Sequence, residues 1–352
     1  RKDLRRNTYM EELRDGPRGL LDRMGWVKYL VILFGYLYSM HTVFNMTGIF
    51  VRSNNMMKAF DVISYVIRSF FAALNLQQAF KISTSSKRLW HRFFYSSGRK
   101  SSFNISTMIK ALVFLYFAIE STVVTHIILA GDVEEYASVS FYGFNMTTSN
   151  VTREYIVTAC FFNWTFFSVL SVVPGVLMAD YIAFCLQLRK RLVQFKDIVS
   201  RKAGSQVSSR ELKQYQEMSY NFWKDLKRVD DIYNTVVFLW YIDIIINMVL
   251  SMRNLFKGVS TEQFWSDTVY YITLFVLLSL SASSVDTQAR ELMYEVRQLR
   301  KLVSKKDWQS NGQILLLESG LKTTRLALTS GHFRMIDRPF VLGVVGAIAT
   351  YT

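Results

Sequence analysis

Three ionisable side chains, Arg68, Glu120 and Asp243, fall inside long apolar stretches of this 352-residue chain. An unpaired charge in such surroundings is costly, so residues of this kind are usually paired or functional. Arg68 can pair with either carboxylate, and a structural ion pair explains the pattern as well as a ligand-binding charge does. If the carboxylates line a pocket, that pocket would favour a cationic or hydrogen-bonding ligand.

The sequence carries no pattern typical of an enzyme or a metal site. Its four histidines form no pair with metal-ligand spacing, and the HExxH, P-loop, GxSxG and CxxC motifs do not occur. Cys160 and Cys185 fall in one predicted helix, about 38 Å apart at the helical rise, so they cannot form a disulfide bond within it. We therefore expect no catalytic residue, no metal and no cofactor.

Long apolar helices are the elements that must position these residues. A membrane-spanning helix needs about 20 mostly apolar residues, whereas a soluble helical protein would need charged residues at helical spacing, which most of these stretches lack. Six stretches qualify, and the end of the chain cuts a seventh short. They cover residues 27–51, 60–80, 108–130, 155–186, 236–252, 269–285 and 340 onward. We predict an all-α membrane protein with seven transmembrane helices, the last of which continues in a longer protein.

The distribution of Lys and Arg predicts the orientation of the chain. The sequence holds 42 Lys and Arg against 27 Asp and Glu, a net charge of +15 that by itself would suggest a nucleic-acid partner. Lys and Arg instead alternate between the segments outside the predicted spans, in counts of 8, 2, 6, 1, 11, 2 and 9. Because Lys and Arg are retained in the cytoplasm, we expect a multi-pass protein of the plasma membrane with a cytoplasmic N-terminus, an extracellular C-terminus and no nucleic-acid partner.

From this orientation we predict which of the remaining segments are extracellular and which are cytoplasmic. Asn145 and Asn150 begin sequons in the predicted extracellular loop 131–154, so we expect both to be glycosylated. The predicted organisation is a cytoplasmic segment 1–26, transmembrane helices in 27–186, a cytoplasmic helical extension 187–235, transmembrane helices in 236–285, cytoplasmic anchor helices in 286–334, and the start of the seventh helix in 335–352.

Apolar side chains recur at helical spacing in the predicted cytoplasmic segments. After a break at Ala203-Gly204-Ser205, Ser208 and Glu211 form a capping-box pattern that begins a new helix. The apolar positions are Leu212, Tyr215, Phe222, Leu226, Val229 and Tyr233, then Leu292, Val296, Leu299 and Val303, then Ile314, Leu317, Leu321, Leu326 and Leu328 of a helix expected over 313–330. Such stripes must be buried even outside lipid, so we predict a cytoplasmic helical bundle, formed within one chain or shared between subunits.

The last predicted helix has one face of small residues. Asp337 can cap this helix, and Pro339 suits its first turn, where the missing N–H costs nothing. The small face consists of Gly343, Gly346, Ala347 and Thr350, and the bulky face of Val344, Val345, Ile348 and Tyr351. Small faces let helices approach closely. By spacing alone, ordinary helix packing explains this face better than a pore around a symmetry axis does.

The end of the chain resembles a known family. The segments Ser330-Gly331-His332-Phe333, Ile336-Asp337 and Gly346-Ala347-Ile348-Ala349-Thr350-Tyr351 are similar to the C-terminal signature of the arthropod gustatory receptors. That signature continues from Thr-Tyr through five hydrophobic residues to Gln-Phe, and only Thr350-Tyr351 is present in this sequence. The related insect odorant receptors share the fold but lack the Thr-Tyr pair. A G-protein-coupled receptor, a further alternative, has the opposite orientation.

The resemblance implies a tastant-gated, non-selective cation channel of four subunits, homomeric or heteromeric, in the lipid bilayer. It implies that the seventh helix lines the central pore. The pore-lining residues would then be Gly343, Gly346, Ala347, Thr350 and Tyr351. The resemblance also implies that the predicted cytoplasmic helices form an anchor shared by the subunits.

Aromatic and polar residues gather in the predicted outer halves of the spans, as a site for a small organic ligand requires. The candidate ligand-binding residues are Tyr65, Glu120, His126, Trp164, Trp240, Asp243 and Tyr271. Trp and Tyr near the ends of spans also serve as interface anchors, so each aromatic residue has that alternative role. The class of ligand, whether sugar, bitter compound, pheromone or another stimulus, stays open.

Overall fold

The computed structural model is almost entirely helical over the residues that it describes. These residues are 29–37, 39–40, 56–95, 101–130, 153–202, 207–256, 262–302, 308–323, 326–331 and 334–351. The all-α prediction is confirmed, because the described residues of each predicted span from the second to the seventh lie in one helix. The described part of the first predicted span is helical as well.

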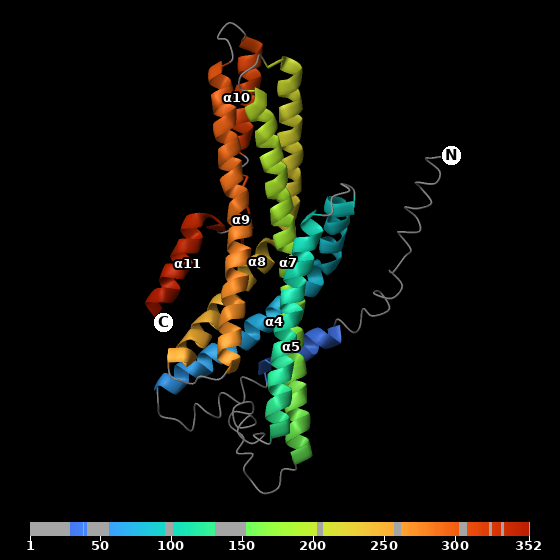
Figure 1. The fold of residues 1–352 in the computed structure, drawn as a ribbon, viewed down its shortest axis with the longest axis vertical. Coiled ribbons are helices and arrows are strands. Elements are labelled where there is room, and N and C mark those ends of the chain that lie inside the picture. The colour runs from blue at the N-terminus through green and yellow to red at the C-terminus, as the bar shows by residue number, and fades with distance from the viewer. Residues whose placement is uncertain are drawn as a thin grey trace, which may run out of the picture.

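Figure 1 shows the long helices α7, α8 and α9 running along the molecule, with α4 crossing them and α11 at one edge. The helices are α4 (Met56–Trp90), α5 (Ser101–Ala130), α7 (Arg153–Lys202), α8 (Ser209–Phe256), α9 (Glu262–Leu302), α10 (Trp308–Thr323) and α11 (Arg338–Tyr351), with a π-helical turn η1 (His91–Tyr95) after α4. Two short strands, β1 (Thr329–Ser330) and β2 (Arg334–Met335), pair antiparallel between α10 and α11.

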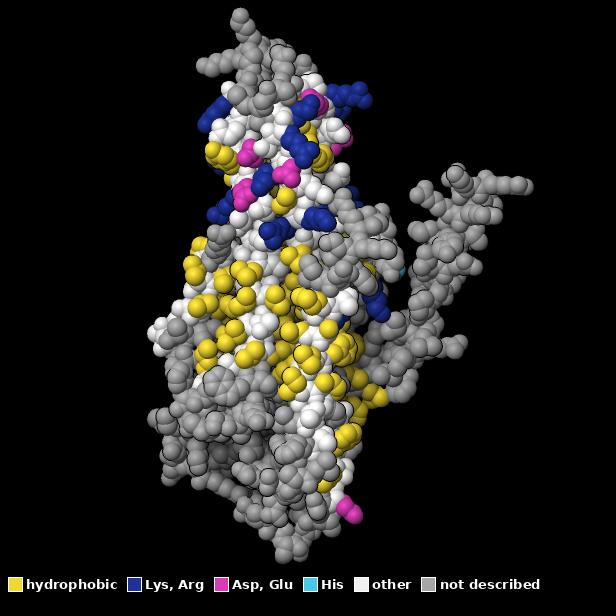
Figure 2. All heavy atoms as spheres, viewed as in Figure 1, with side chains coloured by type: hydrophobic (Ala, Val, Ile, Leu, Met, Phe, Trp, Pro, Cys, Tyr) yellow, Lys and Arg dark blue, Asp and Glu magenta, His cyan; other side chains and the backbone are white. Residues whose placement is uncertain are grey.

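The three long helices exceed the thickness of a bilayer. α7, α8 and α9 contain 50, 48 and 41 residues, which corresponds to about 75, 72 and 62 Å at the helical rise, against a hydrocarbon core of about 30 Å. Within the described part of the chain, these three are the helices long and apolar enough to cross a membrane. A helix of this length that crosses a membrane must continue beyond it. Figure 2 shows the matching surface, with an apolar band below a zone of charged side chains.

The charged end of the molecule is a bundle of four helical segments, here called the distal bundle. It consists of residues 187–202 of α7, 209–235 of α8, 286–302 of α9 and the whole of α10. Its core consists of the predicted apolar stripes. The buried members are Leu212, Tyr215, Phe222, Leu226, Val229, Tyr233, Leu292, Val296, Leu299, Ile314, Leu317 and Leu321. One chain therefore buries these stripes by itself.

Ion pairs join neighbouring helices on the outside of the distal bundle. Lys196 of α7 pairs with Glu291 of α9 at 2.7 Å. Glu318 of α10 pairs with Arg297 and Arg300 of α9 at 3.0 and 3.2 Å. Because solvent-accessible ion pairs contribute little to stability, burial of the apolar stripes is the main term that holds the bundle together.

The predicted capping box begins α8. The Glu211 N–H donates to Ser208 Oγ at 3.3 Å, and the Ser208 N–H donates to Glu211 Oε2 at 2.9 Å. Lys202, at the end of α7, pairs with Glu211 at 2.8 Å. Hydrogen bonds from Lys202 and then from Ser208 lower the pKa of Glu211 from 4.5 to about 2. The cap therefore stays charged at physiological pH.

The helix expected over 313–330 is wrong in its second half, because α10 ends at Thr323. Leu326 and Leu328 are buried as predicted, but they belong to the extended segment that leads into β1. Apolar residues two apart suit an extended chain with one buried face as well as they suit a helix. The sequence pattern therefore identified the buried residues but not their conformation.

This extended segment is held by α8. Asp230 accepts hydrogen bonds from the Thr329 N–H at 2.7 Å and from the Thr329 hydroxyl. The N–H of Gly331, which has a φ of 62°, donates to the carbonyl of Asn234 at 2.8 Å. A left-handed φ is easily adopted by glycine, and it lets the chain turn back into β2. The donors of this segment thus bond to α8 instead of continuing a helix.

Candidate functional site

Ionisable and hydroxyl side chains of four helices meet among the predicted membrane spans, in what we call the membrane polar cluster. Its members are Arg68 of α4, Tyr116 of α5, Asp243 of α8, and Asp267, Tyr270 and Tyr271 of α9. The Arg68 guanidinium interacts electrostatically with the carboxylates of Asp243 and Asp267. Of the two partners predicted for Arg68, Asp243 therefore does interact with it. The side chain of Glu120 lies outside the described residues.

Asp267 has a second partner on α5. It is 7% exposed, and the Tyr116 hydroxyl donates a hydrogen bond to its carboxylate. The Tyr116 ring stacks on Tyr270 with centroids 3.8 Å apart, and Tyr270 meets Tyr271 edge to face at 5.3 Å. One hydroxyl and one guanidinium thus stabilise the carboxylate beside a wall of aromatic rings.

Amide side chains lie beside the other carboxylate. Asn247 Nδ2 donates to Asp243 Oδ1 at 3.1 Å and to the Asp243 carbonyl at 2.7 Å. Asn75 of α4 is fully buried and interacts with the charge of Asp243, yet neither of its amide atoms has a hydrogen bond of normal geometry. Asn247 Oδ1 also lacks one. Buried polar atoms are rarely left in this state, so this part of the cluster has hydrogen-bonding capacity for another molecule.

The structure places two of the predicted ligand-binding residues, Asp243 and Tyr271, in the membrane polar cluster. Trp240 has different neighbours: its buried ring lies 6.2 Å from the rings of Tyr181 and Tyr233, in the aromatic core between α7 and α8. The side chains of Tyr65, Glu120, His126 and Trp164 lie outside the described residues, although their backbones belong to α4, α5 and α7.

Sequence reasoning does not identify Asp267, Tyr116 or Asn75. Asp267 precedes the predicted sixth span by two residues, so a hydropathy pattern counts it with a loop. Tyr116 and Asn75 lie in apolar spans, and their chemical role depends on helices distant in the sequence. Helical spacing gives one usable signal, because Asn75 follows Arg68 by seven residues, about two turns, and shares its face.

An ion pair between Lys110 and Asp180, also not predicted, joins α5 to α7. Lys110 Nζ lies 2.5 Å from Asp180 Oδ1, and the Ser106 hydroxyl donates to the same oxygen at 3.3 Å. The Lys110 ammonium also lies 5.1 Å from the centre of the Trp90 ring. Because the two charges pair with each other, this contact serves to join the helices. Within the described ranges, no group of three or more His, Cys, Asp or Glu residues could hold a metal ion.

Gly175 of α7 allows a close approach to the aromatic wall. A Cβ atom at this position would lie 3.0 Å from Val113 Cγ1 and 3.2 Å from the Tyr270 hydroxyl. Pro174 precedes this glycine, and α7 continues as one helix through the pair. Since Tyr270 stacks on Tyr116, the absent side chain at Gly175 is part of how the cluster is packed.

The last helix is capped as predicted, and its small residues are exposed. Asp337 Oδ1 accepts a hydrogen bond from the Phe340 N–H at 2.9 Å, and Phe340 packs against the core. Gly343, Gly346 and Thr350 are exposed. Nothing lies within 4 Å of a Cβ atom built on either glycine. The side chains of Ala347 and Tyr351 and the sequons at Asn145 and Asn150 lie outside the described residues.

The architecture is that of an all-helical membrane protein with a polar site among its helices. Residues 16–352 match the family model described as 7tm Chemosensory receptor. The chain belongs to this chemosensory receptor family. No curated protein sequence matches the chain.

Two solved structures are similar to this chain over most of its length. The insect olfactory receptor OR5 from Machilis hrabei matches with a TM-score of 0.65 and 13% identity, over 92% of this chain and 86% of that one. The same receptor in complex with eugenol matches with a TM-score of 0.67 and 14% identity, over the same shares of the two chains. At these identities the likeness shows the fold alone.

Filling the space at Gly175 should destabilise the protein. We expect Gly175→Val to lower the melting temperature of the purified protein by about 5 °C, because the new side chain would overlap Val113 and the Tyr270 hydroxyl. Gly312→Val is the matched control, since nothing lies within 4 Å of a Cβ atom there. Equal melting temperatures for the two variants would contradict the packing described for Gly175.

Proposed function

We propose that this chain is a gustatory receptor subunit, part of a non-selective cation channel that a tastant opens. The observation that carries the proposal is the membrane polar cluster, where Arg68 faces two carboxylates and the buried Asn75 amide has no hydrogen bond of normal geometry. Ionisable groups between membrane helices are usually functional, and hydrogen-bonding capacity beside aromatic rings suits a small organic molecule. Binding and gating, rather than catalysis, are the activities proposed.

An odorant-receptor type of channel subunit is the second candidate. The similar solved structures are olfactory receptors, one of them in complex with the small molecule eugenol. Their low identity to this chain gives no preference between types of ligand. The Thr350-Tyr351 pair, in its glycine-bearing helix, favours the gustatory type. Tastants and volatile odorants in one stimulus panel distinguish the two candidates.

The charge of the membrane polar cluster favours a cationic or hydrogen-bonding tastant. Arg68 is a single base facing two acids, Asp243 and Asp267, so acidic groups outnumber basic ones among these three residues. In surroundings of low dielectric constant such an imbalance attracts a cation or a strong hydrogen-bond donor. The Asn75 amide offers both a donor and an acceptor.

We propose that the distal bundle lies in the cytoplasm and that α11 runs outward through the plasma membrane. The alternating counts of Lys and Arg support this orientation. The charged zone above the apolar band in Figure 2 is the surface that an aqueous bundle needs. In this orientation Asn145 and Asn150 are extracellular and available for glycosylation.

The exposed small face of α11 supports a pore formed by four copies of this helix. Gly343, Gly346 and Thr350 are exposed, and among the described residues no atom lies within 4 Å of a Cβ atom built on either glycine, while Phe340 and Val344 attach the helix to the core. An apolar attachment on one side and a small, partly polar face on the other are what a pore-lining helix requires. We propose homomeric assembly, with a heteromer as the alternative.

One aromatic contact links the cluster to the proposed pore helix. The Tyr241 ring of α8 meets Phe340, in the first turn of α11, with centroids 5.2 Å apart and ring planes at 85°. Its hydroxyl lies 3.2 Å from that of Ser279 on α9. Because Tyr241 lies two residues before Asp243, a ligand that moves Asp243 would also move the attachment of α11.

Removing either carboxylate charge should weaken the response to the tastant. In cells that express this chain, we expect Asp243→Asn and Asp267→Asn each to raise the half-maximal ligand concentration by about tenfold or more, because each removes a charge from the site. Whole-cell recording against sugars, bitter alkaloids, fatty acids and volatile odorants measures this shift. Asp197→Asn, which changes an exposed aspartate of the distal bundle, is the control. Unchanged responses of both site variants at normal surface expression would exclude the cluster as the ligand site.

A cysteine on the small face of α11 should be reachable from the pore. We expect a charged, membrane-impermeant thiol reagent, applied from outside, to reduce the ligand-evoked current of Gly346→Cys to less than about half. The reagent attached to the new cysteine would occupy the ion path. Val344→Cys, on the side of α11 that packs against the core, should keep its current. Equal effects of the reagent on both variants would contradict the proposed pore face.

A further inference from the structure

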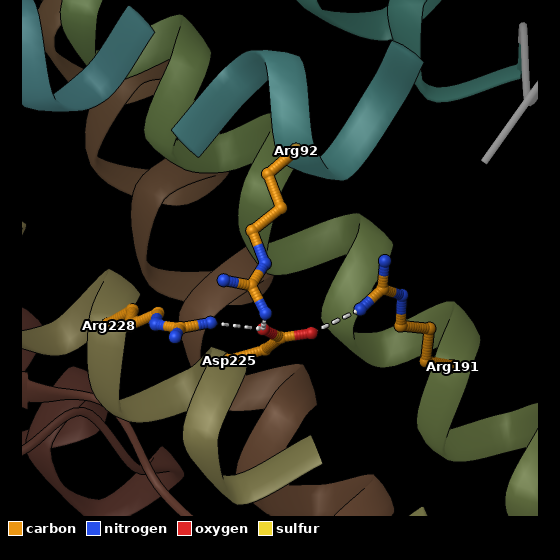
Figure 3. A network of polar contacts seen from close by, with 4 residues as sticks. All are labelled: Arg92, Arg191, Asp225 and Arg228. Carbon is orange, nitrogen blue, oxygen red and sulfur yellow. Dashed lines mark hydrogen bonds and ion pairs between the residues drawn. The ribbon is translucent and has the colours of Figure 1, made fainter. Parts of the chain in front are cut away.

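Three arginines from three elements converge on one carboxylate, as Figure 3 shows. Asp225 of α8 pairs with Arg191 of α7 at 2.7 Å, with Arg228 of α8 at 3.4 Å and with Arg92 of η1 at 3.5 Å. The Asp225 side chain is 13% exposed, whereas those of Arg92 and Arg228 are 53% and 34% exposed. The Asp225 carboxylate therefore lies beneath the guanidinium groups of Arg92 and Arg228, which are the more exposed side chains.

Basic side chains outnumber the acid in this group. Three guanidinium groups against one carboxylate leave two positive charges among these four residues. Each guanidinium has about five N–H donors, and a carboxylate has about four acceptor positions. Arg92 and Arg228 share one oxygen, Asp225 Oδ1. Both distances are longer than the roughly 2.7 to 2.9 Å that is typical of a charge-assisted hydrogen bond. Because the Arg92 and Arg228 side chains are partly exposed, a further anion can approach their guanidinium groups from outside.

Arg191 fixes the geometry of the group. Its guanidinium carbon lies 4.7 Å from the centre of the Phe93 ring, and Phe93 is fully buried in the turn that carries Arg92. Its contact with Asp225 is the shortest of the three. The other two guanidinium groups are thus presented from a rigid junction of η1, α7 and α8.

The group lies where the membrane spans give way to the distal bundle. Arg191 follows the predicted end of the fourth span by five residues, and Arg228 precedes the predicted start of the fifth by eight. Arg92 lies two residues after the end of α4 and twelve after the predicted end of the second span, which α4 holds. Figure 2 shows that the apolar surface gives way to a charged zone along the molecule, as it would at a layer of lipid headgroups.

We infer that Arg92, Arg228 and Arg191 form a binding site for the phosphorylated headgroup of an anionic lipid, in the leaflet on the side of the distal bundle. Guanidinium groups match phosphate oxygens in pairs, and the cytoplasmic leaflet supplies anionic lipids at this depth. The inference uses the proposed membrane placement but not the proposed channel activity.

Native mass spectrometry of the full chain in micelles tests this site. The protein is titrated with phosphatidylinositol bisphosphate, with phosphatidylcholine as the neutral lipid and with soluble inositol trisphosphate as the headgroup without acyl chains. We expect Arg92→Gln and Arg228→Gln, made separately, each to weaken binding of the anionic lipid about fivefold, and the double variant about 25-fold. The same lipid should raise the melting temperature of the unaltered protein.

Arg290→Gln is the matched control. Arg290 lies just beyond the predicted sixth span, is 63% exposed, and pairs with a single acid, Asp286, at 2.8 Å. This variant should bind the lipid within about twofold of the unaltered protein. Equal losses in Arg290→Gln and the two site variants would overturn the inference, as would the absence of any thermal stabilisation by the lipid. Binding of inositol trisphosphate as tight as that of the lipid would overturn the assignment to a membrane headgroup.

Discussion

Each of the helices α7, α8 and α9 passes from lipid to water without a break. The side chains along each helix must therefore suit two different environments. In the apolar half, side chains such as Leu280 and Val269 of α9, both 60% exposed, can face lipid without cost. In the distal bundle the surface is charged, and apolar residues are confined to inward stripes. In the apolar half, hydrophobic side chains lie on all sides of each helix, and in the distal bundle they lie only on the inward side. The position of this change along each helix therefore determines where the helix leaves the membrane.

The same constraint explains why the polar groups of the apolar half are gathered in clusters. A charge that cannot reach water must find a partner on a neighbouring helix, as Arg68 does with Asp243 and Asp267. Lys110 does so with Asp180. The two pairings differ in balance. Lys110 and Asp180 pair one to one, whereas the membrane polar cluster has two acids for one base, with amide atoms that lack hydrogen bonds of normal geometry nearby. That difference is the reason to propose a ligand at one and only helix packing at the other.

Features that depend on local spacing could be predicted, and features that depend on tertiary contact could not. The stripe from Leu212 to Val229 follows the helical period, and the capping box needs only Ser208 and Glu211 three residues apart. By contrast, the bond between Tyr116 and Asp267 joins residues 151 positions apart, and no local pattern indicates it.

The error in the helix expected over 313–330 has a related cause. The burial of Leu326 and Leu328 could be predicted, but their conformation depends on Asp230 and Asn234 of another helix, which bond to the segment that follows. Arg68 was recognisable as a residue in need of a partner, because charge within an apolar run is rare. Which carboxylate it meets is decided by how α4 packs against α8 and α7.

Spin labels along α9 test the passage from lipid to water most directly. Single labels at Leu280 and Tyr294 would occupy exposed positions, about 21 Å apart at the helical rise. In reconstituted bilayers, the account predicts that dissolved oxygen relaxes the label at position 280 more than a water-soluble nickel chelate does, and that the order is reversed at position 294. Similar access of the nickel chelate to both labels would contradict it, because α9 would then not leave the membrane between them.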